Sequence, residues 1–242
     1  MRNSLTVLGT CGAWPEAGRA ASGFLLEADG FRLVMDLGYA TLPRLLARCT
    51  ANELGAVVLT HEHPDHCADL SALCRVLLYG GRQDRVPLYC PTGVLARVQA
   101  MEPTEDLREV FDPHPLPGRY QVGPFLLDGR LLPHHVPHAG VRLTAPNLTV
   151  AYSGDAGPDR VLSELAAGAD PLIAGATLQG TTADPHLLSA VQAGQWAARA
   201  DVARLVLTHF WPGADRRQSL AEAGVAYSGE ILTADEGMVL TL

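Results

Sequence analysis

The segment from His61 to His66, with the sequence HEHPDH, is the feature that most restricts what this chain can fold into. It follows the apolar run 56–59, which is typical of a buried strand. It precedes residues 67–79, where apolar side chains recur at helical spacing. We therefore expect the segment in a turn between a strand end and a helix start, where catalytic loops concentrate. Neutral imidazoles and carboxylates are ligands of zinc and similar divalent ions, so the segment predicts a metal site.

Three other apolar segments end in a residue that could bind a metal. His134 follows Leu131-Leu132-Pro133, Asp155 follows the run that ends at Gly154, and His209 follows 204–208. Each alone is a weak indication, because strand ends often carry polar surface groups. Together with the HEHPDH segment they give seven candidate ligands, which are His61, His63, Asp65, His66, His134, Asp155 and His209. Seven ligands suffice for two metal ions, each held by three side chains, with one carboxylate bridging them.

Length and composition favour one large globular domain. The chain has 242 residues, of which 48% are hydrophobic and 18% charged. No apolar run is long enough to cross a membrane, and the N-terminal segment lacks the apolar core of a signal peptide. The five cysteines include no Cys-x-x-Cys pair, which suggests reduced packing thiols in a cytoplasmic protein. The net charge of -8 argues against binding a long nucleic acid, whose affinity rests on phosphate neutralisation.

The pattern of apolar segments predicts an α/β protein, with residues 1–242 forming a single domain of two similar halves, about 1–120 and 121–242. Strands are predicted at 4–8, 22–28, 31–36, 56–60, 86–90, 122–128, 130–134, 140–145, 148–153, 171–174 and 204–208. Helices are predicted at 41–49, 66–79, 92–100, 158–167 and 185–200. The proline-rich segment 102–120 is expected to be an irregular loop. Strands that alternate with helices and hairpins indicate two mixed sheets with helices outside.

With these motifs in view, the chain resembles hydrolases of the metallo-β-lactamase fold, on the ribonuclease Z-like and phosphodiesterase side of that superfamily. The resemblance covers nearly the whole chain. Besides HEHPDH, it rests on the segments 9–15 (GTCGAWP), 21–26 (ASGFLL), 33–38 (LVMDLG) and 207–213 (LTHFWPG). It implies a four-layer αββα sandwich, built from two mixed sheets with helices outside and the metals at one edge.

The resemblance also implies a role for each candidate ligand. It assigns His61, His63 and His134 to a first metal, Asp65, His66 and His209 to a second, and Asp155 to both as a bridge. His138 competes with His134, although the spacing to Gly140-Val141-Arg142 points to His134. Asp36 could orient a ligand imidazole, or it could be a turn residue before Gly38. The two ions are expected to be zinc, and manganese or iron would accept the same ligands.

Two residues are predicted to be catalytic. Asp65 would orient a hydroxide that bridges the two metals. Asp184 and Pro185 favour a helix start, which would place His186 in the first helical turn, where it could assist the leaving group. In ribonuclease Z-like proteins a Glu orients that histidine, whereas Gly175 stands at the matching position here. The alternative is that His186 is only an exposed residue at a helix start.

The substrate is less constrained than the site. The leading hypothesis is a phosphodiesterase that acts on a small phosphodiester or a cyclic nucleotide. The alternatives are a hydrolase of a lactone, thioester or other ester, and a catalytically degenerate metal-binding member. Ribonuclease Z carries a long tRNA-binding arm, and only a hairpin fits between Arg142 and Ser153, so tRNA 3′-processing is not expected. The partners expected are a small-molecule substrate and, by family habit, a second copy in a homodimer, with no membrane.

Overall fold

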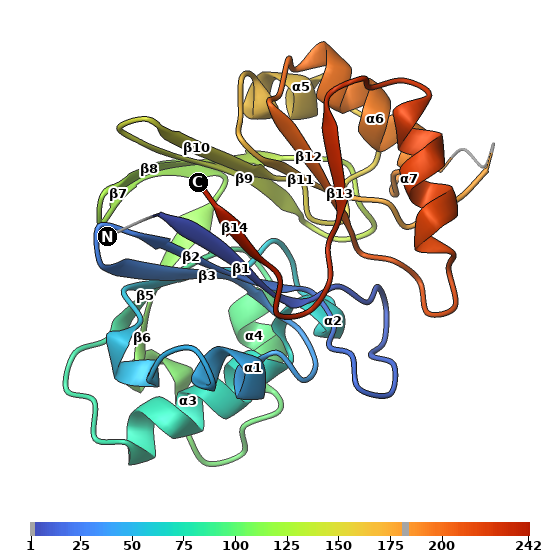
Figure 1. Cartoon of the computed structure of the whole chain (residues 1–242). Helices are drawn as coiled ribbons and strands as arrows, with labels where there is room; N and C mark the ends of the chain where they lie inside the picture. Colours follow the sequence, from blue (N-terminus) through green and yellow to red (C-terminus); the bar gives the residue numbers. More distant parts are fainter. Residues whose placement is uncertain (1–2, 181–183) are drawn as a thin grey trace. The chain divides into compact units, whose positions relative to one another are not determined.

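The computed structural model describes residues 3–180 and 184–242 and divides the chain into two compact units (Figure 1). Unit 1 contains the chain up to Leu116 and the segment Asp235–Leu242, and unit 2 contains Pro117–Ala234. Within the described residues, each unit holds one seven-stranded mixed sheet with helices. The predicted α/β class with two mixed sheets is therefore confirmed. The prediction of a single domain made of two halves did not include the return of the last residues to unit 1.

Unit 1 is a sheet with the strand order β14-β1-β2-β3-β4-β5-β6. Its strands are β1 (Ser4–Gly9), β2 (Gly23–Ala28), β3 (Phe31–Leu37), β4 (Ala56–Val58), β5 (Val86–Pro91), β6 (Phe111–Leu116) and β14 (Val239–Thr241). The strands from β14 to β3 pair antiparallel, and those from β3 to β6 pair parallel. The C-terminal strand thus lies beside the N-terminal one, with Leu5 opposite Leu240.

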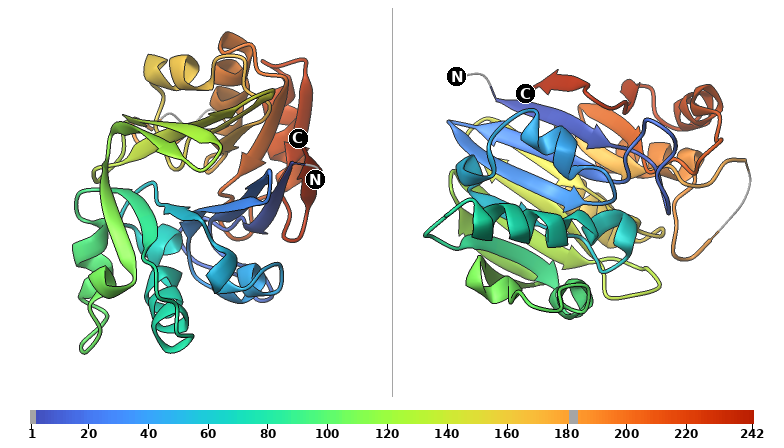
Figure 2. Two further views of the ribbon diagram at one scale, coloured as in Figure 1. Left: turned by 90° about the vertical axis from the view of Figure 1, so that its left-hand side faces the viewer. Right: turned by 90° about the horizontal axis from the view of Figure 1, so that it is seen from below.

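The helices of unit 1 pack on one face of its sheet, as two further views also show (Figure 2). They are α1 (Leu42–Leu46), α2 (Pro64–Cys67), α3 (Asp69–Tyr79) and α4 (Val94–Gln99), with single 3₁₀ turns η1 (Ala51–Glu53) and η2 (Leu107–Glu109). In α3 the apolar residues Leu70, Leu73 and Leu77 recur at helical spacing and are fully buried in the core of the unit. The predicted helix 66–79 is therefore present, but it begins earlier, at Pro64, and divides at Ala68.

The expectation of an irregular loop at 102–120 is wrong. Residues 111–116 form β6, which pairs with β5 along its whole length. Pro113 and Pro115 are two positions apart, so the missing amide hydrogens lie on the same side of the strand. Because β6 lies at the edge of the sheet in the part of the chain that the structure describes, that side needs no partner strand.

Unit 2 is a sheet with the strand order β13-β12-β11-β10-β9-β8-β7. Its strands are β7 (Gly118–Val122), β8 (Phe125–Leu131), β9 (Ala139–Ala145), β10 (Leu148–Tyr152), β11 (Leu172–Gly175), β12 (Arg204–Thr208) and β13 (Glu230–Thr233). The strands from β10 to β13 pair parallel, and those from β7 to β10 pair antiparallel. The helices α5 (Arg160–Ala166), α6 (Ala190–Arg199) and α7 (Arg216–Gly224) lie on one face of this sheet (Figure 1).

Two predictions for unit 2 need correction, and one helix was missed. The strands expected at 122–128 and 130–134 are a single strand, β8, which ends at Leu131, so His134 lies in the following loop. The helix expected at 185–200 begins only at Ala190, because Ser189 and Gln192 form a capping box there. The helix α7 was not predicted, because its buried side chains, Ser219 and Ala223, are too small to mark an apolar stripe. Among the described residues, no helix has the length and apolar character that a membrane crossing requires.

Candidate metal centre

In unit 1 the candidate ligands lie where two parallel strands end. Strands β3 and β4 are parallel neighbours, with Met35 opposite Val58, so the residues that follow them share one edge of the sheet. Asp36 lies at the end of β3, and the HEHPDH loop begins three residues after β4. The loop then enters α2, whose first residue, Pro64, is favoured at a helix start. The predicted position of this motif between a strand and a helix is confirmed.

Asp36 orients two of the candidate ligands in unit 1. Its carboxylate is fully buried and accepts a hydrogen bond from His66 Nδ1 at 2.7 Å. It also accepts from the amide of Thr60 at 2.8 Å and from the Thr60 hydroxyl at 3.0 Å. That hydroxyl lies 3.0 Å from His61 Nδ1 and can accept its hydrogen. The structure therefore favours the orienting reading of Asp36 over the turn-residue reading, and it adds Thr60 as a link to His61.

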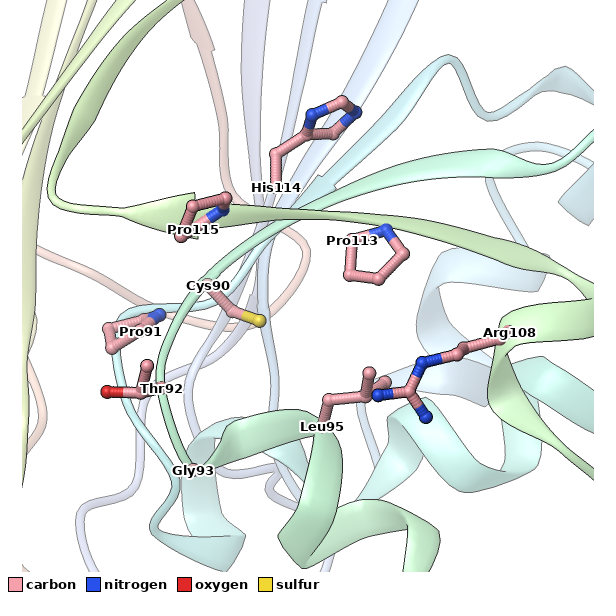
Figure 3. A pocket seen from close by; sticks show the side chains of 9 residues that line it. All are labelled: Cys90, Pro91, Thr92, Gly93, Leu95, Arg108, Pro113, His114 and Pro115. Atoms are coloured by element: carbon pink, nitrogen blue, oxygen red, sulfur yellow. The ribbon is translucent and has the colours of Figure 1, made fainter.

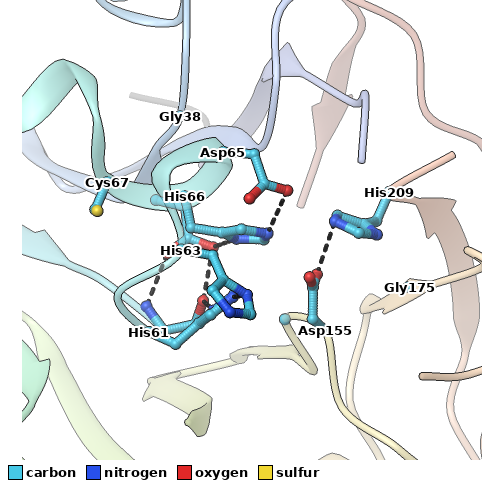
Figure 4. A network of polar contacts seen from close by, with 12 residues as sticks. Gly38, His61, His63, Asp65, His66, Cys67, Asp155, Gly175 and His209 are labelled. Atoms are coloured by element: carbon cyan, nitrogen blue, oxygen red, sulfur yellow. Dashed lines mark hydrogen bonds and ion pairs between the residues drawn. The ribbon is translucent and has the colours of Figure 1, made fainter. Parts of the chain in front are cut away.

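The opposite ring nitrogens face other candidate ligands (Figure 4). His61 Nε2 lies 3.0 Å from His63 Nδ1, and His66 Nε2 lies 3.4 Å from Asp65 Oδ2. The ligand loop of unit 1 thus presents two imidazole pairings whose nitrogens converge as metal ligands do. The neighbouring Cys67 thiol is engaged elsewhere, because its Sγ donates to the carbonyl oxygen of Glu62 at 3.5 Å, and burial raises its pKa to about 12.

Backbone groups fix Asp65 on this loop. The amide of Ala13 donates to Asp65 Oδ2 at 2.7 Å, and Ala13 has a left-handed φ of 63°. The carbonyl oxygen of Asp65 packs against Gly38 so closely that a Cβ at Gly38 would lie 1.9 Å from it. The segments 9–15 and 33–38, two of those that carry the resemblance, therefore contribute contacts to a candidate ligand.

In unit 2 the ends of β10, β11 and β12 bring together Asp155, Thr177 and His209. These three strands are parallel neighbours, so the residues after them lie at one edge of the sheet. His209 Nε2 lies 3.0 Å from Asp155 Oδ1, and both side chains are buried (Figure 4). His209 Nδ1 lies 2.8 Å from the hydroxyl of Thr177, which is also buried. Thr177 therefore orients His209 much as Thr60 orients His61.

Backbone strain marks both sheet edges. Asp36 has φ 58° and His209 has φ 56°, in the left-handed region that non-glycine residues rarely occupy. Such strain is typical of residues held in place for a site rather than for stability.

Gly175, at the end of β11, could not carry the Glu of ribonuclease Z-like proteins without adjustment, because a Cβ would lie 3.1 Å from the carbonyl oxygen of Gly154.

The third candidate ligand of unit 2, His134, lies in the loop after β8. Its Nδ1 donates to the backbone carbonyl of His186 at 3.0 Å, so Nε2 is the nitrogen that would bind a metal ion. His138, the alternative, is fully buried, with its ring 5.4 Å from that of His134. The carbonyl contact favours His134, because metal-binding histidines usually donate the second ring nitrogen to such an acceptor.

His186 does not occupy the helix start that the sequence suggested. It lies in a bend before α6, with its amide donating to Asp184 Oδ1 at 2.7 Å. Its ring is partly exposed, and its neighbours are Asp184, 4.0 Å away between Nδ1 and Oδ1, and the ring of His135 at 4.3 Å. The predicted place of His186 in a first helical turn is therefore wrong, because α6 begins only at Ala190.

The chemistry of four candidate imidazoles, considered within each unit, fits metal binding. Four imidazoles have one ring nitrogen beside a hydroxyl, carboxylate or carbonyl oxygen, namely those of His61, His66, His134 and His209. In three of them the opposite nitrogen faces another candidate ligand. An oxygen partner of this kind fixes the tautomer of a metal-binding histidine. The sequence analysis did not identify the orienting threonines, Thr60 and Thr177. The contact of Thr177 with His209 joins residues 32 positions apart, so no local pattern shows it.

A surface cavity of about 190 Å³ lies beside the ends of β5 and β6 in unit 1 (Figure 3). Arg108 and His114 provide its basic groups, and prolines provide much of the rest of its wall. Gly93, which also lines it, has φ 106°, and a Cβ there would lie 2.5 Å from Glu62 Oε2. Because Glu62 belongs to the HEHPDH loop, the cavity borders that loop without being lined by a candidate ligand.

Comparison with known proteins shows the family to which the chain is similar. A family model described as a beta-lactamase superfamily domain matches residues 31–210. The chain belongs to the beta-lactamase superfamily. The match includes the HEHPDH loop, His134, Asp155 and His209. The resemblance drawn from the sequence motifs is therefore confirmed.

Alignments with individual relatives cover almost the whole chain of this superfamily member. The uncharacterized protein ML1173 of Mycobacterium leprae is 32% identical over 244 residues, covering 94% of this chain and 84% of the relative. The probable metallo-hydrolase YhfI of Bacillus subtilis is 29% identical over 244 residues, covering 97% and 98%. The crystal structure of YhfI, a metallo-beta-lactamase fold protein, gives a TM-score of 0.91 at 27% identity and covers 99% of both chains. A ribonuclease Z of Haloferax volcanii is 28% identical over 304 residues, covering 97% and 93%.

Proposed function

We propose that this member of a metallo-hydrolase family is a phosphodiesterase that acts on a small phosphodiester or a cyclic nucleotide. The observation that carries the proposal is the set of fixed imidazoles. His61, His66 and His209 each have one ring nitrogen held beside an oxygen and the other facing a further candidate ligand. Such an arrangement serves metal binding better than proton transfer by a free histidine.

Two divalent ions are the proposed cofactors, with zinc as the first choice and manganese or iron as acceptable replacements. In the proposed assignment His61, His63 and His134 hold one ion, Asp65, His66 and His209 hold the other, and Asp155 is shared. When bound, the ions would lower the pKa of a water molecule and polarise the phosphoryl group.

Two side chains would handle protons around this chemistry. Asp65 has its Oδ2 fixed by the amide of Ala13, so the orientation of its carboxylate is set before substrate arrives. It would hold the attacking water by accepting a hydrogen bond. His186 would donate a proton to the leaving oxygen, and Asp184, whose Oδ1 lies 4.0 Å from its Nδ1, would orient its ring in the place of the Glu that Gly175 does not supply.

The proposed substrate is small for two reasons. Strands β9 and β10 join through Pro146-Asn147 alone, so the tRNA-binding arm expected in ribonuclease Z proper has no counterpart there. The alignment with the Haloferax volcanii ribonuclease Z spans 304 positions, more than the 242 residues of this chain, so that relative has segments that this chain lacks. A net charge of -8 also disfavours a long polyanion.

A substrate panel combined with metal analysis tests the proposal. The purified protein is expected to contain two divalent ions and to hydrolyse an aryl phosphodiester and a cyclic nucleotide in preference to a lactone or a thioester. Asp65→Ala should abolish turnover, whereas Asp112→Ala, which alters a carboxylate on β6, should not. Hydrolysis of the lactone or thioester alone, or full metal occupancy without turnover of any substrate, would overturn the phosphodiesterase assignment. Accurate cleavage of a tRNA precursor would overturn the proposed substrate size.

A further inference from the structure

Unit 2 contains a second group of metal-binding side chains, separate from the seven candidate ligands. His135, Asp184 and His186 each offer a donor atom, and these atoms all lie within 4.8 Å of one another. The imidazoles of His135 and His186 lie with centroids 4.3 Å apart and an interplanar angle of 39°. His135 is exposed and the other two are partly exposed, so an ion from solution can reach all three.

We propose that His135, Asp184 and His186 form an auxiliary site for a divalent cation, with Zn²⁺ as the preferred ion. Two imidazoles and one carboxylate form a three-ligand set that leaves further positions to water. The side chains already lie near the required spacing, so binding needs only rotations of exposed groups. Because those positions stay open to solvent, the site releases its ion more readily than a closed four-ligand site.

The local backbone supports the ligand geometry. The amide of His186 donates to Asp184 Oδ1, which fixes the carboxylate beside the imidazole that follows it in sequence. The pair His114 and Asp112 on β6 serves as a comparison, because it has no third metal-binding side chain beside it among the described residues. His114 Nε2 and Asp112 Oδ2 lie 3.2 Å apart on β6 and form an ordinary ion pair when the histidine is protonated. Those two residues belong to no group of three metal-capable side chains among the described residues.

The auxiliary site is coupled to the proposed centre through residue 186, and this part of the inference rests on the proposed function. The carbonyl of His186 accepts the hydrogen bond from His134 Nδ1, while its ring belongs to the auxiliary group. An imidazole that binds an ion through one nitrogen cannot become the doubly protonated imidazolium, so His186 loses the form that would supply the donated proton. Filling the auxiliary site therefore inhibits turnover, and the enzyme responds to excess zinc.

Metal stoichiometry tests the binding step without any assay of activity. Protein loaded with its tightly bound ions is equilibrated with Zn²⁺ and with Co²⁺, and bound metal is counted by elemental analysis and cobalt absorption. The wild type should bind one weaker equivalent that His135→Gln and Asp184→Asn each lose. Asp184→Asn keeps a carbonyl oxygen for the His186 amide, so the local turn is retained. His114→Gln is the matched control and should bind as the wild type does. Equal stoichiometry in wild type and both variants would overturn the site.

Zinc titration of turnover tests the coupling separately. Excess Zn²⁺ should inhibit the wild type and His114→Gln, while His135→Gln keeps its basal rate and resists inhibition. If His135→Gln loses the weaker ion and is still inhibited like the wild type, the coupling is refuted. A protein that gains the weaker equivalent and turns over no substrate in any form would refute the proposed function and leave the auxiliary site standing.

Discussion

Replacing Asp36 by asparagine should weaken the binding of both proposed metal ions. Asp36 is fully buried, with Oδ1 accepting from the Thr60 amide and Oδ2 accepting from His66 and from the Thr60 hydroxyl. Asparagine tolerates the left-handed φ of 58°, so the backbone can stay in place. If its carbonyl oxygen replaces Oδ1, its NH₂ group faces His66 Nδ1 and cannot accept that hydrogen. His66 then loses its orienting bond directly, and His61 loses the acceptor behind Thr60.

The expected size of the effect follows from these contacts. Loss of an orienting partner typically weakens a metal site about 10- to 100-fold, which corresponds to about 1.4–2.7 kcal/mol at each ion. The resemblance assigns His61 and His66 to different ions, so both affinities should fall. Two buried donors, His66 Nδ1 and the Thr60 hydroxyl, also lose their acceptor, and each unsatisfied donor costs about 1–3 kcal/mol of folding stability.

Competition with a chromophoric chelator, together with thermal unfolding by circular dichroism, measures both effects. Thr60→Val provides a graded comparison, because it removes the hydroxyl link to His61 and leaves the Asp36–His66 bond intact. That variant should weaken one ion more than the other. Asp69→Asn is the matched control, since Asp69 accepts the Leu42 amide at 2.7 Å and contacts no candidate ligand imidazole. Unchanged affinity for both ions in folded Asp36→Asn would refute the reasoning.

Three further predictions concern unit 2 and the buried thiols. Thr177→Val, which removes the hydroxyl beside His209 Nδ1, should weaken one metal ion about 10-fold in the chelator assay and leave the other unchanged. Arg142→Gln should lower the free energy of unfolding by about 1–3 kcal/mol in urea, since Arg142 donates at 2.8 Å to the last carbonyls of the α5 region; altered metal content would contradict this purely structural role. Burial raises the pKa of Cys67 and Cys90 to about 12, so alkylation of the native protein at pH 8 should be roughly 1000-fold slower than for an ordinary thiol and should rise with pH toward 12.

The parts of the site that could be predicted from sequence are those in which chemistry and position coincide. Three imidazoles and a carboxylate within six residues have few roles other than metal binding, and a strand end is where such groups meet. Asp155 and His209 were predictable for the same reason, because apolar runs place both at strand ends.

The orienting groups could not be predicted, because they depend on which strands become neighbours. The phrase Leu-Thr-His occurs at residues 59–61 and again at 207–209, and it suggests the same role for both threonines. In the structure Thr60 serves His61, whereas the hydroxyl of Thr208 has no hydrogen-bond partner among the described residues. Thr177, at the end of the neighbouring strand β11, contacts His209 instead.

Secondary-structure prediction failed where a local sequence pattern was overridden by contacts formed in the folded chain. Prolines in 102–120 argue for a loop, but the edge of a sheet accepts them in β6. Asp184-Pro185 looks like a helix start, yet the capping box at Ser189 and Gln192 satisfies the amides where α6 begins. The capping box defines the helix start better than Asp184-Pro185 does, because it pairs two side chains with two backbone donors.

Because β1 pairs with β14, the unit 1 sheet cannot be completed until β14 has been synthesised. β1 leaves the ribosome early, and its neighbour β14 (Val239–Thr241) is made only much later. Until then the β1 side of the unit 1 sheet is an open edge, able to accept a strand from another chain. The acidic residues Asp235 and Glu236, which bind Arg19 at 3.1 and 3.2 Å, help to hold the returning segment. Nascent chains, and variants that lack β14, therefore expose a longer open edge than the sheet in which the three-residue strand β14 covers β1.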